Sequence, residues 1–490
     1  MELQKVFTDP RSVTLPLPTL SHPDWKGRTL GEILEENPEE GQRLLDFLAN
    51  GYKGPFHLKL AAALILAESR KWGPFARAQR ARKTTGKKKA EHPVGLTKGL
   101  LQAAVGVAAR FTAKPKGNTI PALEHILVVQ DVNGLTLQAT DLESGVVVRV
   151  PHLKREPPMA GLVPKKALAA AVKAPRAAIK REPVELEWLD RTATLKIKTP
   201  QGDMMLLGMD PVEAPPVPIA PADAPRCTVP TSLLAVAAVA AAGDDARPVL
   251  TGVFVGRQEG KSYIAAADGY RMFYTSDLDL PDKFPDTALI PKKAVEKAAT
   301  VFTGDVAIAV DLSREDLRRA TITGQAKDKT LAQAGAEVSV VTTLIDGLFP
   351  DIERTIGSTF DLPPTLQVAS QAVLDALGSL RATLNGADMI YLVVQDGVLA
   401  LIAKSAEYGN QTIKIPVQYT GEPTFVACNI RYLEEAVKTI QSLGIEEAVL
   451  RVRPLDEKDR PPAKPIGISD PDDRFRWAFM PMHPGDLNPY

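Results

Sequence analysis

Apolar and polar positions alternate along this chain with two periods, and the two periods follow each other in a fixed order. A helical period covers residues 97–111, and strand-like alternation follows in HILVVQ, LTLQAT and VVVRV. Helical periods at 230–242 and 370–383 open the same order of elements again. The pattern therefore predicts an α+β protein in which a helix and several strands recur.

A longer unit also recurs, in which a strand-like run and a polar turn precede a strand that leads into a helix. The copies read LTLQATDLESG and GLVPKKALAAAVK, then YIAAADGYRM and ALIPKKAVEKAATVF, then LALIAKSAEYG and FVACNIRYLEEAVKTI. The separation is the same in each copy, from Asp141 to Pro164, Asp268 to Pro291 and Ser405 to Cys428. A repeat of roughly 130 residues has the length of a domain. We therefore expect three similar domains, at 98–224, 225–356 and 357–490.

The chain before the first repeat has a different composition. Residues 1–69 carry their own helical period and predict a small, mostly helical accessory module. Within it, KGRTLGEI at 26–33 resembles a KGxTLxEI motif found at the C-terminus of some bacterial exonucleases, without the aromatic residues of that motif's second half. Residues 70–97 predict a basic linker, because nine basic residues and no acidic one lie between Arg70 and Lys89. The linker is either a solvated tether or an auxiliary nucleic-acid contact.

Composition and motifs disfavour several classes of protein. No apolar run approaches the ~20 residues that span a bilayer, and the first residues lack the pattern of a signal peptide. Cys227 and Cys428 form neither a disulfide framework nor a zinc-ligand spacing, so we expect buried thiols in the cytoplasm. The sequence contains no GxxxxGK[ST], GxSxG or HExxH motif. We therefore expect that the protein is not an enzyme and binds no cofactor or metal.

Asp141 and Asp268 are the carboxylates that most invite a catalytic interpretation. Their counterpart in the third repeat is Ser405, which cannot replace a carboxylate in acid–base chemistry. A turn role therefore explains all three positions better, because Asp and Ser side chains both accept hydrogen bonds from backbone N–H groups in turns.

The formal net charge is zero, but the charges are segregated. Basic residues outnumber acidic ones on the predicted helices of the repeats, whereas the rest of the repeats is acidic. This distribution suits a body that presents its helices to a polyanion. Ordinary solvated helix faces are the alternative interpretation.

Several motifs occur together in one order: NTIPAL at 118–123, ATDLESG at 139–145, LTGV at 250–253, DGYRM at 268–272, IPKK at 290–293, DGLFPD at 346–351 and FMPM at 479–482. In this order and spacing the chain resembles the bacterial sliding clamp, the β subunit of replicative DNA polymerase, over roughly residues 97–484. The resemblance implies three tandem repeats of the DNA-clamp (processivity fold) domain behind the helical N-terminal module. Two subunits would then form a homodimeric ring that encircles double-stranded DNA without reading its sequence.

The resemblance also implies the functional residues. Basic side chains on the helices would contact phosphate: Arg110, Lys114, Lys116, Lys165, Lys166, Lys173, Arg176, Lys292, Lys293, Lys297, Arg381, Arg431 and Lys438. DNA polymerase and the clamp loader would dock short peptides in an apolar cleft formed by Leu250, Gly269, Tyr270, Arg271, Met272, Pro350, Thr355, Ala478, Met480, Pro481 and Met482.

The sequence departs from the family at three of these places. Tyr270 replaces the usual His, Thr355 replaces an aliphatic residue, and Gly117 replaces an Arg that precedes the NTIP motif. The peptide preference and one DNA contact are therefore expected to differ. A clamp-like scaffold specialised for repair, recombination or a mobile element, which recruits or modulates a nuclease, is the alternative function.

Overall fold

The computed structural model describes residues 95–114, 120–151, 158–173, 177–243, 246–276, 278–313, 318–362, 366–419, 421–456, 460–461 and 463–484. The predicted accessory module, the linker up to residue 94, Lys116 and Arg176 lie outside the described residues. The described residues belong to two compact units. We call them unit 1 (95–217 and 328–338) and unit 2 (218–327 and 339–484).

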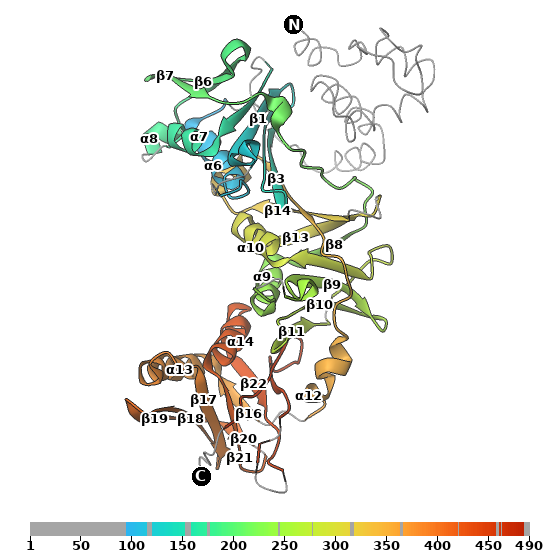
Figure 1. Cartoon of the computed structure of the whole chain (residues 1–490), viewed down its shortest axis with the longest axis vertical. Coiled ribbons are helices and arrows are strands. Elements are labelled where there is room, and N and C mark those ends of the chain that lie inside the picture. The colour runs from blue at the N-terminus through green and yellow to red at the C-terminus, as the bar shows by residue number, and fades with distance from the viewer. Residues whose placement is uncertain are drawn as a thin grey trace, which may run out of the picture. The chain divides into compact units, whose positions relative to one another are not determined.

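Unit 1 contains two antiparallel sheets and four α-helices (Figure 1). The first sheet has the spatial order β4 (Met159–Pro164), β1 (His125–Asp131), β2 (Gly134–Thr140) and β3 (Ser144–Pro151). The second has the order β5 (Glu185–Leu189), β6 (Thr194–Thr199) and β7 (Gly202–Leu207). The helices are α6 (Lys98–Ala108), α7 (Lys165–Ala171), α8 (Ala177–Lys180) and α11 (Lys329–Gln333).

Helix α6 shows how the sequence pattern becomes structure. Thr97 is its N-cap, and the Thr97 Oγ1 accepts a hydrogen bond from the Leu100 amide at 3.2 Å. Leu101, Ala104 and Val105 are buried on one face of the helix, which packs against β2 and β3. The helix predicted at 97–111 is therefore confirmed.

Unit 2 contains the remaining strands. One sheet has the order β12 (Thr287–Pro291), β9 (Gly252–Gln258), β10 (Lys261–Ala267), β11 (Arg271–Thr275), β24 (Arg476–Phe479), β23 (Ile466–Ser469), β22 (Glu447–Arg451), β16 (Leu366–Ala369) and β20 (Gln418–Tyr419). A four-stranded sheet has the order β19 (Gly409–Pro416), β18 (Val398–Ser405), β17 (Met389–Gln395) and β21 (Thr424–Asn429). Strands β8 (Arg226–Pro230) and β14 (Arg319–Ala326) pair with opposite edges of β13 (Phe302–Asp311), and β15 (Glu337–Thr343) follows in the chain.

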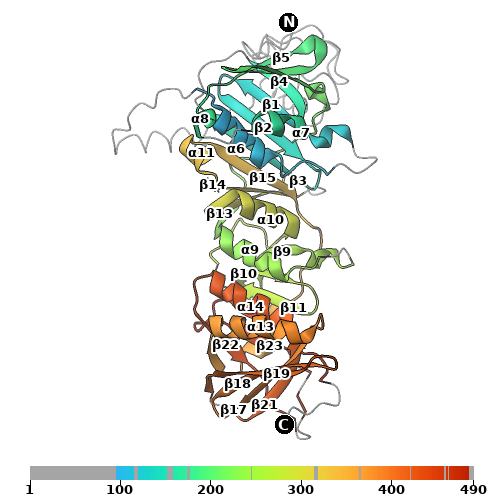
Figure 2. The same cartoon turned by 90° about the vertical axis from the view of Figure 1, so that its left-hand side faces the viewer.

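The long helices of unit 2 are α9 (Thr231–Ala240), α10 (Lys292–Val301), α13 (Ser370–Leu384) and α14 (Ile430–Ser442). They lie on the same side of the unit (Figures 1 and 2). A π-helical turn (Glu353–Gly357) continues into the short helix α12 (Ser358–Phe360). Single 3-10 turns occur at Pro121–Glu124, Asp190–Thr192, Pro211–Glu213 and Pro248–Leu250.

Strands β11 and β24 join the two halves of the nine-stranded sheet. They are antiparallel, with Arg271 opposite Phe479 and Met272 opposite Ala478. The core beneath this junction buries Phe254, Tyr263, Met272, Phe349 and Ala478 among others. Residues from distant parts of the sequence thus share one apolar core.

The recurring junction of strand and helix is present in all three copies. Strand β4 runs into α7, β12 into α10 and β21 into α14. The α+β class predicted from the sequence is confirmed. The boundaries of the three expected domains stay a prediction.

Candidate functional site

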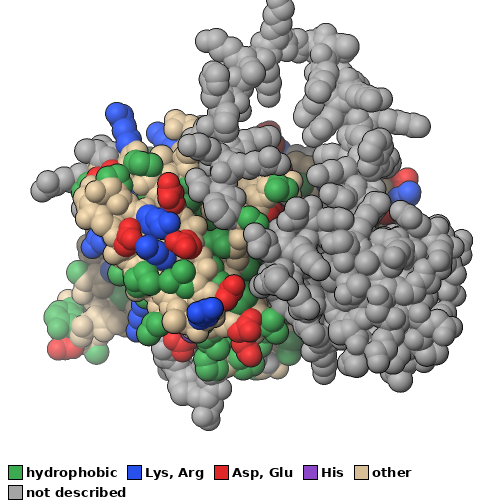
Figure 3. All heavy atoms as spheres, turned by 90° about the horizontal axis from the view of Figure 1, so that it is seen from above, with side chains coloured by type: hydrophobic (Ala, Val, Ile, Leu, Met, Phe, Trp, Pro, Cys, Tyr) green, Lys and Arg blue, Asp and Glu red, His purple; other side chains and the backbone are tan. Residues whose placement is uncertain are grey.

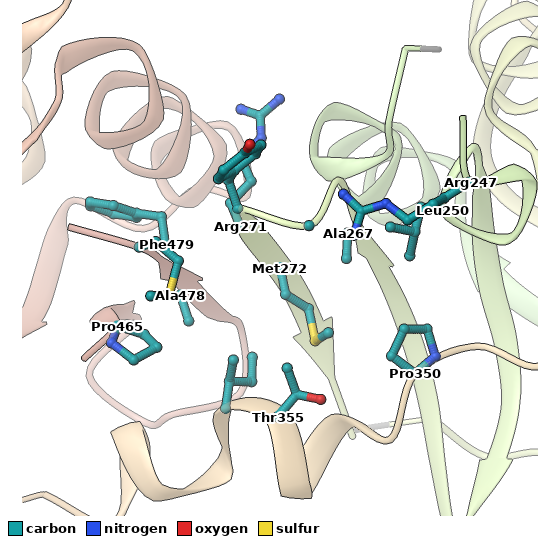
Figure 4. A pocket seen from close by; sticks show the side chains of 14 residues that line it. Arg247, Leu250, Ala267, Arg271, Met272, Pro350, Thr355, Pro465, Ala478 and Phe479 are labelled. Carbon is teal, nitrogen blue, oxygen red and sulfur yellow. The ribbon is translucent and has the colours of Figure 1, made fainter. Parts of the chain in front are cut away.

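A cavity of about 250 Å³ opens beside the junction of β11 and β24 in unit 2 (Figure 4). Its walls come from the turn before β9, from β10 and β11, from the π-helical turn and from the C-terminal segment. The lining residues are Arg247, Leu250, Ala267, Gly269, Tyr270, Arg271, Met272, Pro350, Thr355, Ile356, Pro465, Ala478, Phe479 and Met480. We call this cavity the β11–β24 pocket.

A tight turn between β10 and β11 shapes one wall of the pocket. The Asp268 Oδ1 accepts hydrogen bonds from the Tyr270 amide at 2.9 Å and the Arg271 amide at 3.0 Å. Gly269 adopts a positive φ of 94°, a region that glycine enters without steric cost. A Cβ at this glycine would come within 2.1 Å of the Arg247 Nη2. The turn and the neighbouring arginine therefore both require glycine here.

The equivalent turns in the other repeats use the same device. The Asp141 Oδ1 accepts from the Ser144 amide at 2.8 Å. The Ser405 Oγ accepts from the amides of Glu407 at 3.3 Å and Tyr408 at 3.2 Å. These hydrogen bonds confirm the turn role predicted for the three positions.

The opposite wall is held by a connector that includes Pro350 and the π-helical turn. Gln258 donates to the Pro350 carbonyl at 3.1 Å and accepts from the Ile352 amide at 3.0 Å. The Tyr263 hydroxyl donates to the Glu353 Oε1 at 2.9 Å, and burial raises the pKa of Tyr263. The connector is therefore anchored to β9 and β10.

Arg271 joins the pocket wall to two helices. Its Nε donates to Asp268 at 2.9 Å and its Nη2 donates to the Val239 carbonyl, in the last turn of α9, at 3.0 Å. Its guanidinium also forms an ion pair with Glu435 of α14 and lies 4.8 Å from the ring centroid of Tyr432. The side chain is only 11% exposed, so Arg271 is mainly a structural tie.

The open part of the pocket is apolar with a cationic rim. Met272 is buried at its base, and Tyr270 and Met480 are exposed at its mouth. The charged residues that line it are Arg247 and Arg271, and the lining contains no carboxylate. Such a site can take apolar side chains of a ligand. Arg247 is the exposed cation at its rim, because Arg271 is already paired with Asp268 and Glu435.

The structure brings most of the predicted cleft residues into this one pocket. Pro481 and Met482 are not among the lining residues. The Met480 amide donates to the Tyr270 carbonyl, whereas the Met482 amide donates to the Ala427 carbonyl, both at 2.8 Å. The C-terminal segment therefore leaves the pocket after Met480 and continues along β21.

Sequence reasoning missed Arg247, Ala267, Ile356, Pro465 and Phe479. Phe479 and Arg247 lie within or just before the clamp-like motifs, so the motifs were a usable signal for them. Pro465 had no such signal, because it precedes β23 in an irregular segment.

The predicted phosphate-contacting residues differ in their surroundings. Lys166 and Lys173 are exposed on or next to α7, and Lys114 is exposed after α6. Lys292 points inward instead: its Nζ donates to the Ala241 carbonyl at 2.9 Å, and burial lowers the pKa of Lys292.

The basic residues of α13 and α14 are in ion pairs. Arg381 of α13 and Lys438 of α14 both contact Glu434, and Lys438 does so at 2.5 Å. Arg431 binds Asp388 with two nitrogens, the Nε at 2.9 Å. The hydrogen bond with Asp388 raises the pKa of Arg431. Burial alone would raise the pKa of Glu434, but the hydrogen bonds from Lys438 and Arg381 outweigh it and lower that pKa.

Among the described residues no cluster of His, Cys, Asp and Glu has the arrangement of a metal site. In the same part of the chain, no helix is both long and apolar enough to cross a membrane. On the face shown in Figure 3, Lys and Arg side chains lie beside Asp and Glu.

The fold is that of the DNA polymerase sliding clamps. It matches the crystal structure of the Pseudomonas aeruginosa clamp with a TM-score of 0.64 and 21% identity, over 79% of this chain and 98% of that one. The β subunit of DNA polymerase III from Thermotoga maritima matches with a TM-score of 0.61 and 21% identity, over 80% and 99%. Similarity at this level of identity establishes the shared fold.

Sequence comparison points to the bacterial β sliding clamps. The family model of the central domain of the DNA polymerase III beta subunit matches residues 229–351. The β sliding clamp of Streptococcus pneumoniae serotype 4 is 28% identical over 210 residues, which are 42% of this chain and 51% of the relative. The chain thus matches about half the length of that relative. The Streptomyces coelicolor clamp is 24% identical over 397 residues, or 79% of this chain and 98% of the relative. Together the comparisons support the assignment of this chain to the sliding clamp family.

Proposed function

We propose that this chain is a DNA sliding clamp, which encircles duplex DNA and tethers DNA polymerase and other replication or repair proteins to it. The observation that carries the proposal is the β11–β24 pocket. Leu250, Met272, Pro350 and Met480 come from four separate segments and line one cavity. These segments contain four of the motifs in which the sequence resembles the clamps.

The pocket would bind short peptides of polymerase and clamp loader. Burial of two apolar side chains would contribute roughly 1.5–3 kcal/mol each, less the free energy of ordering the peptide. Further backbone contacts would bring the affinity to roughly micromolar, which permits exchange between partners. The protein would tether without any chemical step of its own and would need no cofactor.

A homodimeric ring is the assembly we propose. Strand β7 ends its three-stranded sheet and β19 ends its four-stranded sheet among the described strands. From the second residue onward, exposed residues alternate with less exposed ones along both strands. Unpaired edge strands are templates for pairing with another chain. Two copies related by a two-fold axis would pair the β7 of each with the β19 of the other.

Duplex DNA would be held through its phosphates by basic side chains of the helices. Phosphate contacts carry no sequence information, so the protein would slide without reading bases. The assignment of the chain to three tandem clamp domains and to the cytoplasm belongs to the same proposal. The specialised scaffold with a nuclease-related role depends on residues 1–69, which lie outside the described part of the chain.

Loading onto circular DNA tests the proposal. A nicked circular plasmid is incubated with the full chain and its cognate clamp loader, and retained protein is measured by gel filtration before and after the plasmid is linearised. We expect retention on the circle and loss on the linear form, because the attachment is topological. Equal retention on both forms, or none on either, would contradict a ring.

A further inference from the structure

The cations predicted to contact DNA are not equivalent, and the difference rests on which of them already have an anionic partner. On the proposed function, we infer that α7 makes the main phosphate contact, whereas α13 and α14 present a largely neutralised surface to the duplex. Helix α7 would then carry most of the electrostatic attraction to DNA.

Helix α7 and the residue after its C-cap carry Lys165, Lys166 and Lys173. None of the three forms an ion pair within the part of the chain that the structure describes. Lys166 and Lys173 are exposed, and the first turn of α7 contains no acidic residue. A phosphate that approaches this helix therefore meets positive charge without first displacing a carboxylate.

Helices α13 and α14 carry Arg381, Arg431 and Lys438, each of which has a carboxylate partner. Glu434 lies between Arg381 and Lys438, so two cations share one anion. Asp388, which follows α13 in the chain, holds Arg431 through two nitrogens, a strong form of ion pair. Three cations thus face two carboxylates, and the exposed Asp375 of α13 adds a third negative charge, so this surface is close to neutral.

A phosphate would have two obstacles here. It would have to compete for guanidinium donors that Asp388 already occupies, and the carboxylates that remain nearby would repel it. Solvent-exposed ion pairs are weak enough to exchange, so the surface need not exclude DNA. It would, however, release fewer counterions than α7 on binding, and counterion release is the source of the salt dependence.

The other helices of unit 2 add little to the attraction. Helix α9 (TSLLAVAAVA) contains no basic residue. In α10, the Lys292 ammonium is directed to the Ala241 carbonyl at 2.9 Å. Lys293 and Lys297 of α10 also have interaction partners, whereas Lys180 of the next helix after α7, α8, is exposed. Helix α7 together with α8 is therefore the exposed basic part of the described helices that has no carboxylate partner.

Matched charge deletions test the inference. Binding of the full-length chain to a linear duplex is measured across a range of salt concentrations for wild type, for Lys166→Gln with Lys173→Gln, and for Arg431→Gln with Lys438→Gln. Each double variant removes two positive charges, and the N-terminal residues stay present in all three proteins, so their contribution cancels. The slope of log K against log salt becomes shallower by about 0.9 for each phosphate that the protein no longer neutralises.

We expect the slope of the α7 variant to be shallower than that of wild type by roughly 1–2, and the slope of the α14 variant to stay within about 0.5 of wild type. Asp388→Asn should steepen the slope, because it releases Arg431 to bind phosphate. An unchanged dimer mass for each variant shows that the fold is retained. An equal change of slope in both double variants, or a larger change in the α14 variant, would overturn the inference alone. The loading assay on circular and linear plasmid tests the proposed function separately, and equal retention of wild type on both forms would overturn that function.

Discussion

Arg271 and Glu435 form an ion pair that connects the wall of the β11–β24 pocket to helix α14. The two residues come from distant repeats of the sequence, and the arginine also holds the last turn of α9 through the Val239 carbonyl. A side chain with this many partners fixes the spacing between strand and helices. The pocket therefore has a preformed wall rather than one assembled by the ligand.

Glu435→Gln tests how much this ion pair contributes to the free energy of unfolding. Loss of the carboxylate leaves the largely buried Arg271 guanidinium with Asp268 as its remaining counterion. Glu435 itself is 38% exposed, so solvent screens part of the effect. We expect the free energy of unfolding in urea to fall by about 1 kcal/mol. Glu446→Gln, at an exposed position after α14, is the matched control and should stay near wild type. Equal stability of both variants would show that the pair contributes nothing.

Met480→Ala and Met482→Ala distinguish a peptide bound in the β11–β24 pocket from one bound along β21. The two methionines are similarly exposed, at 39% and 37%, but Met480 lines the pocket and Met482 does not. We expect Met480→Ala to weaken a fluorescent clamp-binding peptide about tenfold, or about 1.4 kcal/mol. Met482→Ala should change the affinity less than twofold in the same titration. The opposite order would place the peptide along β21 instead.

The proposed ring can be opened at β7. Leu207 is 74% exposed on this edge strand, and a charge there would be buried without a partner when β19 of a second copy pairs with it. Leu207→Asp should therefore sediment as a monomer at micromolar concentration, where we expect wild type to have twice the mass of one chain. Val132→Asp, at a 66% exposed position in the β1–β2 turn, should remain dimeric. A dimeric Leu207→Asp variant would exclude β7 from the interface.

Stability should decline at alkaline pH, partly through Cys227. Burial raises the pKa of this thiol from 9.0 to about 12. Since the folded-state pKa exceeds the unfolded one, the thiol contributes fully below pH 9 and its contribution is lost as the pH rises toward 12. By about pH 10.5 the loss is about 2 kcal/mol, at ~1.4 kcal/mol per pH unit.

Cys227→Ala lacks this titration, so the stability gap between wild type and variant should narrow by about 2 kcal/mol between pH 8 and about pH 10.5. Urea unfolding at the two pH values measures the gap. A constant gap would mean that the thiol ionises as easily in the folded protein as in the unfolded one.

Local features of the fold were predictable from the sequence because they depend on near neighbours. The turn role of Asp268 follows from hydrogen bonds to amides two and three residues away. The helix behind Thr97 follows from a cap and a buried face within four residues. Such contacts recur wherever the same short pattern recurs.

The composition of the pocket was predictable only through the motifs. Leu250, Met272 and Met480 could be grouped because each lies in a segment that resembles the clamps, and no periodicity links them. Pro465 was missed because it lies in no such motif and its place in the pocket depends on how distant segments pack.

The sequence by itself determined the α+β class, the recurring strand–helix junction and the identity of the basic helix residues. Each of these depends on the pattern of a few neighbouring positions. Only the tertiary structure decided which of those cations keep an unopposed charge. Asp388 reaches Arg431, Glu434 bridges Arg381 to Lys438, and the Ala241 carbonyl takes the Lys292 ammonium. Net charge is a property of composition, whereas local electrostatic potential depends on distances between groups that folding brings together.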